Sequence, residues 1–161
     1  MEALHAMKII SNMIEAHIFC KKEIGIEFLL LKRNEKEIYG GLWQMITGKI
    51  RKGEKAYKAA LREIKEETYL KPKRFWVTPN VNSFYSHEKN YISLLPVFAA
   101  EVEPGSKVII SKEHIESGWF KPEEAKKLLA WPGQRKSIDI ITEYFVKEIS
   151  YWNFVEIKLK E

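Results

Sequence analysis

The stretch GKIRKGEKAYKAALREIKEETYL, residues 48–70, decides the fold. Over 55–69 the apolar residues recur with the helical period of about 100° per residue, so we expect a helix there. One stripe of this helix would pack on a sheet, and it consists of Tyr57, Leu61, Ile64 and Thr68. Lys58 and Lys65 fall on another face and are expected to point into water.

A third face of the same helix carries three acids, Glu63, Glu66 and Glu67. Like charges three or four residues apart destabilise a helix, so a cation should lie beside them. A hard ion such as Mg²⁺ prefers oxygen ligands and keeps several waters. Small residues upstream would let a loop or a ligand approach this face: Ala56, Ala59 and Ala60. Taken alone, the segment also fits a solvated Glu/Lys face in which Arg62 pairs with Glu66.

The segments on either side of the helix have the patterns of strands, turns and further helices. A polar loop, 34–41, ends in two glycines, and polar turn residues occupy 87–90. Strands are predicted over 14–20, 26–31, 42–46, 75–85, 91–102 and 117–120. Helices are predicted over 122–129 and 133–149. This order favours an α/β fold in which helices pack on a mixed sheet.

Composition limits the classes of protein that the sequence fits. The chain has 161 residues, which suits a single domain over 1–161, with 1–12 expected to be poorly ordered or partly outside the core. A formal charge of +5 favours anionic ligands, but the basic residues are interspersed with Glu, so no nucleic-acid partner is expected. Cys20 is the only cysteine and reads as a buried strand residue, which excludes an internal disulfide.

The same survey gives expectations for location and assembly. The longest apolar stretch, 92–100, is far shorter than the ~20 residues needed to span a bilayer, and no basic-then-apolar leader precedes Met7. We therefore expect a cytoplasmic protein without a membrane partner. Monomer and homodimer both remain open.

The spacing of residues 48–70 resembles the Nudix box. That pattern is Gly, five residues, Glu, seven residues, Arg-Glu, an aliphatic residue, any residue, Glu-Glu, any residue, Gly, an aliphatic residue. The matching positions are Gly48, Glu54, Arg62, Glu63, Ile64, Glu66, Glu67 and Leu70. With each fixed residue type at roughly 6% frequency, six matches arise by chance with a probability on the order of 10⁻⁷ per start site. Tyr69 departs from the pattern because it replaces the second Gly, so either the helix ends differently or some strain is accepted.

The resemblance implies a Nudix fold, with a mixed sheet sandwiched between helices, and a pyrophosphohydrolase activity. It implies that Mg²⁺, or Mn²⁺ in its place, assists attack of water on a pyrophosphate phosphorus. The implied metal ligands are the carboxylates of Glu63, Glu66 and Glu67 and the carbonyl of Gly48. Glu54 would be a structural residue of the box. Arg62 would orient the acids, and Arg62, Glu66 and Glu67 belong to the implied catalytic set.

Two flanking segments, WQMITGKI (43–50) and KEHIESGWFKPEEAKKLLAWPGQRKSI (112–138), resemble the Nudix branch that acts on dATP and dihydroneopterin triphosphate. In that branch a Glu in a loop facing the box has been considered as the general base, and Glu113 is the matching candidate. His114 beside it is either functional or an ordinary loop residue.

Five residues are candidates for binding a nucleotide-type small molecule: Arg33, Trp43, Gln44, Trp131 and Arg135. Arg33 could hold a phosphate, although an exposed arginine at a strand end is equally common. Trp43 and Trp131 could stack on a base or could fill the core. The leading substrate is a nucleoside or pterin triphosphate, cleaved to the monophosphate and pyrophosphate. The alternatives are a dinucleoside polyphosphate or nucleotide sugar, a sensor domain that binds without cleavage, and a basic surface for RNA ends.

Overall fold

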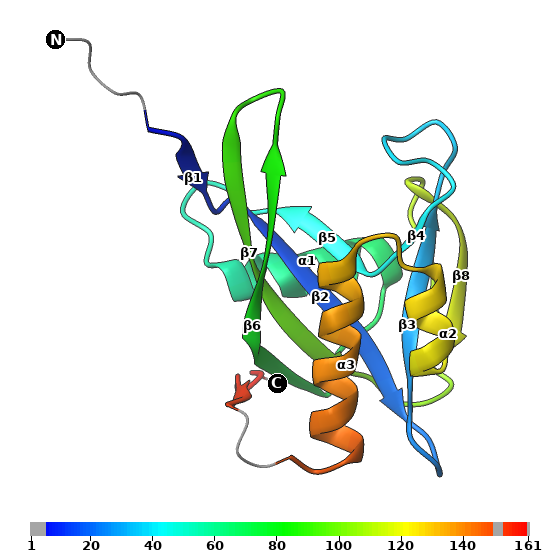
Figure 1. The fold of residues 1–161 in the computed structure, drawn as a ribbon. Coiled ribbons are helices and arrows are strands. Elements are labelled where there is room, and N and C mark those ends of the chain that lie inside the picture. Colours follow the sequence, from blue (N-terminus) through cyan, green and yellow to red (C-terminus); the bar gives the residue numbers. More distant parts are fainter. Residues whose placement is uncertain (1–5, 150–152, 161) are drawn as a thin grey trace, which may run out of the picture.

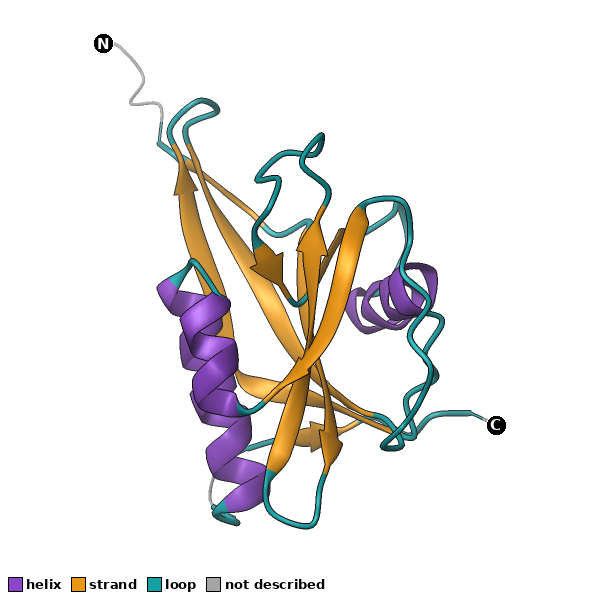
Figure 2. Cartoon of the chain, turned by 90° about the vertical axis from the view of Figure 1, so that its right-hand side faces the viewer, coloured by secondary structure: helices purple, strands orange, loops and turns teal. Residues whose placement is uncertain are grey.

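The structure is a computed structural model that describes residues 6–149 and 153–160. Its helices are α1 (Ala56–Thr68), α2 (Pro122–Leu128) and α3 (Pro132–Val146). Its strands are β1 (Lys8–Ile10), β2 (Met13–Lys21), β3 (Ile26–Arg33), β4 (Trp43–Gln44), β5 (Ile46–Lys49), β6 (Arg74–Ser86), β7 (Tyr91–Glu101), β8 (His114–Phe120) and β9 (Val155–Glu156). Figure 1 shows α1 behind the strands and α2 and α3 in front of them, and Figure 2 shows the same layers from the side. The expected α/β sandwich with a mixed sheet is confirmed.

The sheet is built around the parallel neighbours β2 and β7. Within the described residues the order of strands is β4-β3-β2-β7-β6-β9, while β5 pairs with β2, β8 with β3 and β1 with β7. The β1–β7 pair is also parallel, and the other pairs are antiparallel. Pairing of β5 with β2 places Gly48 opposite Ile14. The stretch 48–70 therefore starts on β5, next to the central strand β2, and continues through a short loop into α1.

Most predicted elements occur within a few residues of their expected bounds, but one strand prediction is wrong. The single strand expected over 42–46 is two short strands, β4 on β3 and β5 on β2, because the chain passes from one partner strand to the other at the buried Met45. The expected strand 117–120 is the end of the longer β8. The last helix ends at Val146 instead of residue 149.

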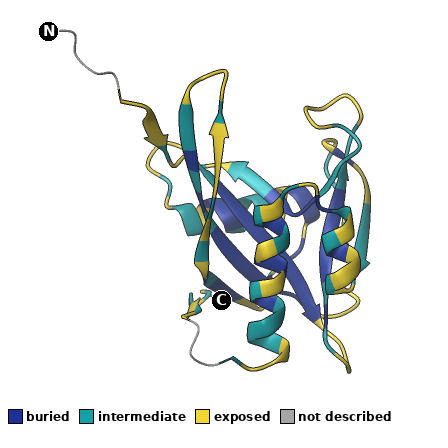
Figure 3. Cartoon of the chain, viewed as in Figure 1, coloured by how far each residue is buried: buried dark blue, intermediate teal, exposed yellow. Residues whose placement is uncertain are grey.

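Two apolar layers lie between the sheet and its helices. Figure 3 shows that most of β2 and β3, between these layers, is buried. The layer under α1 includes Ile14, Ile46 and Ile64, and the layer under α2 and α3 includes Phe28 and Ile138. Each large side chain removed from water in this way contributes about 1.5–3 kcal/mol. Cys20 is buried on β2 as expected. The two layers fix the position of α1 on the sheet.

The expectation that the alanines of α1 leave room for a loop or a ligand is wrong for two of them. Ala59 and Ala60 are completely buried in the layer under α1, and Ala56 packs against that layer. Their small side chains instead let the helix lie close to the sheet, since a longer side chain would hold it away. Lys58 and Lys65 are exposed, as predicted.

Helix α1 ends at a strained residue. Tyr69 has a φ of +60°, a left-handed conformation that usually belongs to Gly, and its N–H donates to the Lys65 carbonyl. Inside the last turn, Thr68 Oγ1 donates to the Ile64 carbonyl and accepts a bond from the Leu70 N–H. The helix therefore ends at the position where the box pattern has Gly, and Tyr69 adopts the strained conformation there. This confirms the alternative in which strain is accepted and excludes a different helix end.

A buried polar cluster interrupts the layer between the sheet and α3. Glu15 on β2 is 1% exposed and accepts hydrogen bonds from His17 Nε2 at 3.0 Å, Asn82 Nδ2 at 3.0 Å and Ser137 Oγ at 3.1 Å. Asn80 Nδ2 donates in turn to Ser137 Oγ. Burial alone would raise the pKa of Glu15, but the bonds from His17, Asn82 and Ser137 outweigh it and lower the pKa below its ordinary value.

Strand β1 is the first described element of the chain. Of the segment 1–12, expected to be poorly ordered or partly outside the core, residues 1–5 lie outside the described part of the chain. Strand β1 follows them and pairs with β7, and its Ile9 is exposed. No helix in the described part of the chain combines the length and the apolar character needed to cross a membrane.

Candidate active site

The acids of α1 form one wall of an open cleft of about 340 Å³. The lining residues are Glu63, Glu66, Glu67, Ser111, Lys112 and Glu113. Hydrogen bonds hold the opposite wall in place: the Asn34 N–H donates to the Glu113 carbonyl at 2.8 Å, and the Ile109 N–H donates to the Thr68 carbonyl at 3.0 Å. The structure therefore brings Glu113 to face the three acids, as the sequence predicted. Ser111 and Lys112 were not predicted, because the path of a loop gives no periodic signal.

Arg62 joins the acids to the loop that precedes α1. Its Nε and Nη2 donate to the two carboxylate oxygens of Glu54, both at 2.9 Å. Its Nη1 donates to Glu63 at 2.7 Å and to Glu66 at 3.3 Å, and Nη2 also donates to the Lys49 carbonyl at 2.9 Å. The bond to Glu66 is the i,i+4 pair of the solvated-face alternative, but it is one bond of a larger network. Such a bidentate, charge-assisted pair fixes the orientation of both partners.

The network shifts the acidity of its members in opposite directions. Hydrogen bonds from Arg62, followed by one from the Arg51 backbone, lower the pKa of Glu54 to about 2. Burial raises the pKa of Glu63, and the nearby charges of Glu66 and Glu113 add to that rise, although Arg62 opposes it. Glu54 is thus ionised at neutral pH, whereas the surroundings of Glu63 disfavour its ionised form.

Glu67 is the most perturbed acid of the cleft. It is 7% exposed, and its Oε2 has no hydrogen-bond partner among the described residues. Burial, followed by repulsion from Glu63 and Glu113, raises its pKa to about 9, although the charge of Arg33 opposes this rise. An ionised carboxylate here lacks the positive charge and the donors that a buried anion needs.

Gly48 allows the acids to approach the sheet. A Cβ at this position would lie 2.3 Å from Cδ of Glu63, a distance at which something must shift. The Glu63 carboxyl therefore rests directly on the Gly48 backbone. The closeness of a carboxylate and a backbone segment suits a ligand that binds carboxylate and carbonyl oxygens together.

These residues fit a divalent cation. A hard cation next to Glu67 would offset the repulsion among the acids and occupy the unpartnered Oε2. In residues 6–149 and 153–160 no three His, Cys, Asp or Glu side chains converge as a closed ligand set. Mg²⁺ does not need a closed set of protein ligands, because it keeps several waters and binds substrate phosphates.

The comparison with known families matches this site. Residues 17–139 match the family model of the NUDIX domain. The chain belongs to the NUDIX domain family. The family assignment agrees with the fold and with the acids of α1.

One curated relative shares the domain within a longer protein. An octanoyltransferase of Myxococcus xanthus is 32% identical over an alignment of 117 residues, and the match covers 68% of this chain and 30% of that protein. The chain thus spans about 30% of the length of this curated relative, so the activity in that name describes a longer protein.

Three solved structures have a similar fold. A NUDIX hydrolase of Listeria monocytogenes is 24% identical with a TM-score of 0.73, covering 85% of this chain and 95% of that one. A Caenorhabditis elegans Ap4A hydrolase is 21% identical with a TM-score of 0.70, covering 88% and 99%. The Escherichia coli dihydroneopterin triphosphate pyrophosphohydrolase is 23% identical with a TM-score of 0.65, covering 84% and 94%. At such identities the likeness establishes the NUDIX fold.

The five predicted substrate-binding residues lie outside the set that lines the acid cleft of this NUDIX domain. Arg33 is half-buried at the end of β3, and its Nε donates to the Ile38 carbonyl at 2.8 Å. Trp43 packs edge-on against Phe120 with ring centroids 5.3 Å apart, and it belongs to the apolar layer under α2 and α3. The alternative that an aromatic residue fills the core thus describes Trp43. Gln44 is buried on β4.

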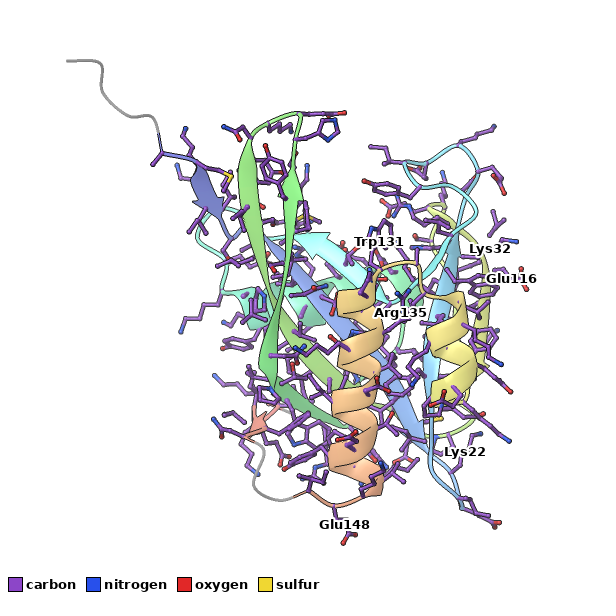
Figure 4. All side chains as sticks on the ribbon, viewed as in Figure 1. Lys22, Lys32, Glu116, Trp131, Arg135 and Glu148 are labelled. Carbon is purple, nitrogen blue, oxygen red and sulfur yellow. The ribbon has the colours of Figure 1, made fainter. Side chains whose placement is uncertain are left out.

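Trp131 and Arg135 lie together near the beginning of α3 (Figure 4). Nη1 of Arg135 donates to the carbonyls of Leu129 and Ala130, at 2.8 and 3.0 Å. Arg135 therefore holds the connection between α2 and α3, which carries Trp131. Trp131 itself contacts Tyr39 of the loop between β3 and β4, a residue that no sequence pattern singled out.

His114 is a buried polar residue beside Glu113. It lies opposite Arg33 where β8 pairs with β3, and neither ring nitrogen has a hydrogen-bond partner among the described residues. Burial, followed by the charge of Arg33, lowers its pKa to about 4. The imidazole is therefore neutral at physiological pH.

Proposed function

We propose that the chain hydrolyses a pyrophosphate bond of a nucleoside triphosphate or a pterin triphosphate and releases the monophosphate and pyrophosphate. The observation that carries this proposal is the cleft lined by Glu63, Glu66, Glu67 and Glu113, together with the buried Glu67 Oε2, which has no hydrogen-bond partner among the described residues. Such a cluster attracts a metal-bound polyphosphate, because the metal supplies the positive charge that the acids lack.

In this proposal the acids and the backbone share the work of holding the metal. The carboxylates of Glu63, Glu66 and Glu67 and the carbonyl of Gly48 would bind Mg²⁺, for which Mn²⁺ can substitute. When bound, the ion lowers the pKa of a water molecule and neutralises charge on the phosphate oxygens. Arg62 keeps Glu63 oriented through the bond of 2.7 Å.

Glu113 is the proposed general base. It is exposed on the wall opposite α1, so its carboxylate can accept a proton from the water that attacks phosphorus. The proton moves from the water oxygen to a Glu113 carboxylate oxygen, and the bond between phosphorus and the bridging oxygen breaks. We also propose that Arg33, whose charge acts on Glu67, offsets negative charge on the substrate phosphates.

The choice of substrate class rests on sequence likeness outside the box. The segments 43–50 and 112–138 resemble the branch that acts on dATP and dihydroneopterin triphosphate. The similar fold of the Escherichia coli enzyme is compatible with this choice, as is the fold of the Ap4A hydrolase with the dinucleoside polyphosphate alternative. The substrate panel described below separates these classes by product.

The test is an activity panel with a matched pair of variants on α1. Purified protein is incubated with Mg²⁺ and dATP, other nucleoside triphosphates, dihydroneopterin triphosphate, Ap4A and nucleotide sugars, and pyrophosphate and monophosphate are measured. Glu67→Gln should lower kcat at least about 100-fold. Lys65→Gln, an exposed change on the same helix, should leave it unchanged. Tight binding of a nucleotide without turnover would favour the sensor alternative, and undiminished cleavage by Glu67→Gln would refute the metal site.

We further propose that residues 1–161 act as one domain on a small molecule in the cytoplasm, as a monomer or a homodimer. The lone Cys20 supports a reducing compartment. Binding of a labelled RNA of random sequence at physiological salt would contradict the expected absence of a nucleic-acid partner, and light scattering would distinguish the two assembly states.

A further inference from the structure

The carboxylate of Glu66 contacts two guanidinium groups. Its Oε2 accepts a hydrogen bond from Nη1 of Arg62 at 3.3 Å, and its Oε1 accepts one from Nη2 of Arg51 at 3.4 Å. Both oxygens of a proposed metal ligand therefore have a cationic partner within the protein. A metal ion that binds Glu66 competes with one of the two arginines for a carboxylate oxygen.

The two arginines differ in how firmly they are held. The Arg62 side chain is 16% exposed, and it also donates to Glu54 and Glu63. The Arg51 side chain is 66% exposed and pairs with a carboxylate that is itself 48% exposed. Exposed ion pairs contribute little free energy, because water screens the charges and two long side chains must be ordered. Arg51 is therefore the arginine that a metal ion can displace from Glu66.

The backbone of Arg51 is fixed although its side chain is exposed. Its N–H donates to Oε1 of Glu54 at 3.1 Å, and its carbonyl accepts a bond from the Glu54 N–H at 3.0 Å. Glu54 is held in turn by Nε and Nη2 of Arg62. A guanidinium that leaves Glu66 therefore stays beside the acid cleft, which Glu66 lines.

The surroundings of Arg51 suit a phosphate. Four carboxylates line the cleft next to it, and the phosphates of a substrate add further negative charge. A guanidinium matches the geometry of a phosphate as well as that of a carboxylate, and it can bind either group through two hydrogen bonds. A displaced Arg51 is thus a suitable partner for a substrate phosphate.

We propose that Arg51 exchanges partners when substrate binds: the metal replaces it on Glu66, and its guanidinium then binds a phosphate of the substrate. The inference rests on the proposed function, because it takes Glu66 as a metal ligand and a polyphosphate as the substrate. Arg51 thus weakens the binding of the metal alone and strengthens the binding of polyphosphate to the metal-loaded protein. The cleft therefore favours the metal together with a polyphosphate over the free metal ion.

Two binding measurements with opposite expected signs test the exchange. Calorimetry measures the binding of Mn²⁺ alone, and then the binding of inorganic tripolyphosphate with saturating Ca²⁺ in place of Mg²⁺. Arg51→Gln should bind Mn²⁺ about threefold more tightly than the wild type and tripolyphosphate about 10-fold more weakly. Lys52→Gln is the matched control, because it removes the same charge from the adjacent exposed residue, and it should change both affinities less than about twofold.

Two further variants examine the charge and the partner. Arg51→Lys keeps the charge without the fork, so its Mn²⁺ affinity should stay within about twofold of the wild type, and its tripolyphosphate affinity should fall less than that of Arg51→Gln. In a Glu66→Gln background, Arg51→Gln should leave Mn²⁺ binding unchanged, since the contested carboxylate is gone. A gain of the same size in that background would contradict competition for Glu66.

The outcomes separate this exchange from the proposed function. A loss of both affinities in Arg51→Gln would indicate a structural role in the turn before α1 and would overturn the exchange, as would changes of equal size in Lys52→Gln. A wild type that binds Mn²⁺ as tightly as Arg51→Gln does would refute the exchange alone. A wild type that binds no Mn²⁺ would refute the metal site of the proposed function together with the exchange.

Discussion

Two buried carboxylates on opposite faces of the sheet have opposite surroundings. Glu15, under α3, accepts three hydrogen bonds from neutral or cationic donors, and its pKa is lowered. Glu67, on α1, faces Glu63 and Glu113, leaves one oxygen unpartnered, and has a pKa raised to about 9. The two carboxylates are both buried, but only Glu15 has hydrogen-bond donors that compensate for the loss of water.

The difference shows what burial of a charge means at each place. A buried carboxylate with full hydrogen bonding stabilises the fold, because its donors would otherwise remain unpaired. A buried carboxylate among other acids costs stability, and a protein retains such a group where it is needed for binding or chemistry. Glu15 is accordingly a structural residue, and Glu67 belongs to the proposed active site.

The largest effect is expected from Arg62→Ala, because Arg62 is the cation that orients the acids of the cleft. Glu54 and Glu63 would lose their closest donors, so the free energy of unfolding should fall. Activity should fall about 10–100-fold because the acids lose their orientation. Urea unfolding and kcat/KM measure the two effects. Arg62→Lys, which keeps the charge without the fork, should recover only part of each, and full recovery would contradict the role of the bidentate geometry.

The next prediction concerns Glu15→Gln, which disrupts the buried hydrogen-bond cluster around Glu15. An amide cannot accept all three bonds, so the free energy of unfolding at pH 7 should fall by about 1–3 kcal/mol. Because the folded pKa of Glu15 is lowered, its contribution is present above the unfolded pKa near 4.5 and is lost as pH falls through the folded pKa. The difference between variant and wild type, followed by urea unfolding, should therefore shrink in acid.

Glu27→Gln provides the control for that experiment, because Glu27 forms a surface ion pair with Lys22 at 3.3 Å. Its effect should stay within about 0.5 kcal/mol. An equal loss in both variants would show that the cluster around Glu15 has no special stability.

A smaller effect is expected from Gly48→Ala, which pushes one acid out of place without changing any charge. The new Cβ would collide with Glu63, so that carboxylate must move and metal-dependent kcat/KM should fall about 10-fold. Stability should fall by about 1–3 kcal/mol from overpacking. In a double-mutant cycle with Glu63→Ala the second loss should nearly vanish, since the collision partner is gone. Strict additivity would exclude this contact as the cause.

The smallest effect is expected at the end of the same helix. Tyr69→Gly relieves the left-handed conformation, and Tyr69 is 69% exposed, so little packing is lost. Gly has more freedom than Tyr in the unfolded chain, which offsets part of this gain. The free energy of unfolding, measured by thermal unfolding, should therefore rise by about 0.5–1 kcal/mol, and activity should not change. A loss of activity would mean that Tyr69 belongs to the site, in spite of its place beyond the acids.

The sequence predicted the parts that depend on local periodicity. The helix expected over 55–69 is α1 with its two capping residues, because fifteen residues of amphipathic pattern fix both the type and the phase of a helix. The resemblance to the Nudix box, and not periodicity, singled out Arg62 with Glu54 and the facing Glu113, and the structure brings these residues together with the acids of α1. The roles proposed for these residues remain predictions.

The parts that escaped prediction depend on tertiary neighbours. The separation of β4 from β5 follows from a change of partner strand, and Ser111 and Lys112 reach the cleft by the path of a loop. Tyr39 had no signal in the sequence. The sequence did contain a signal for the cluster around Glu15. Glu15 and His17 alternate with apolar residues in a strand, so both lie on the same face of the sheet.

The most direct test of the account is the stability of Glu67→Gln against the wild type, without divalent ions, between pH 4 and pH 8.5. A folded pKa of about 9 means that the stability linked to Glu67 is complete below the unfolded pKa near 4.5 and is lost as pH rises toward 9. Gln does not titrate. The variant should therefore match the wild type near pH 4 and be about 1–3 kcal/mol more stable at pH 8 in urea unfolding. A variant that is less stable at pH 8, or a difference that does not change with pH, would contradict the claim that the acids of α1 need a cation.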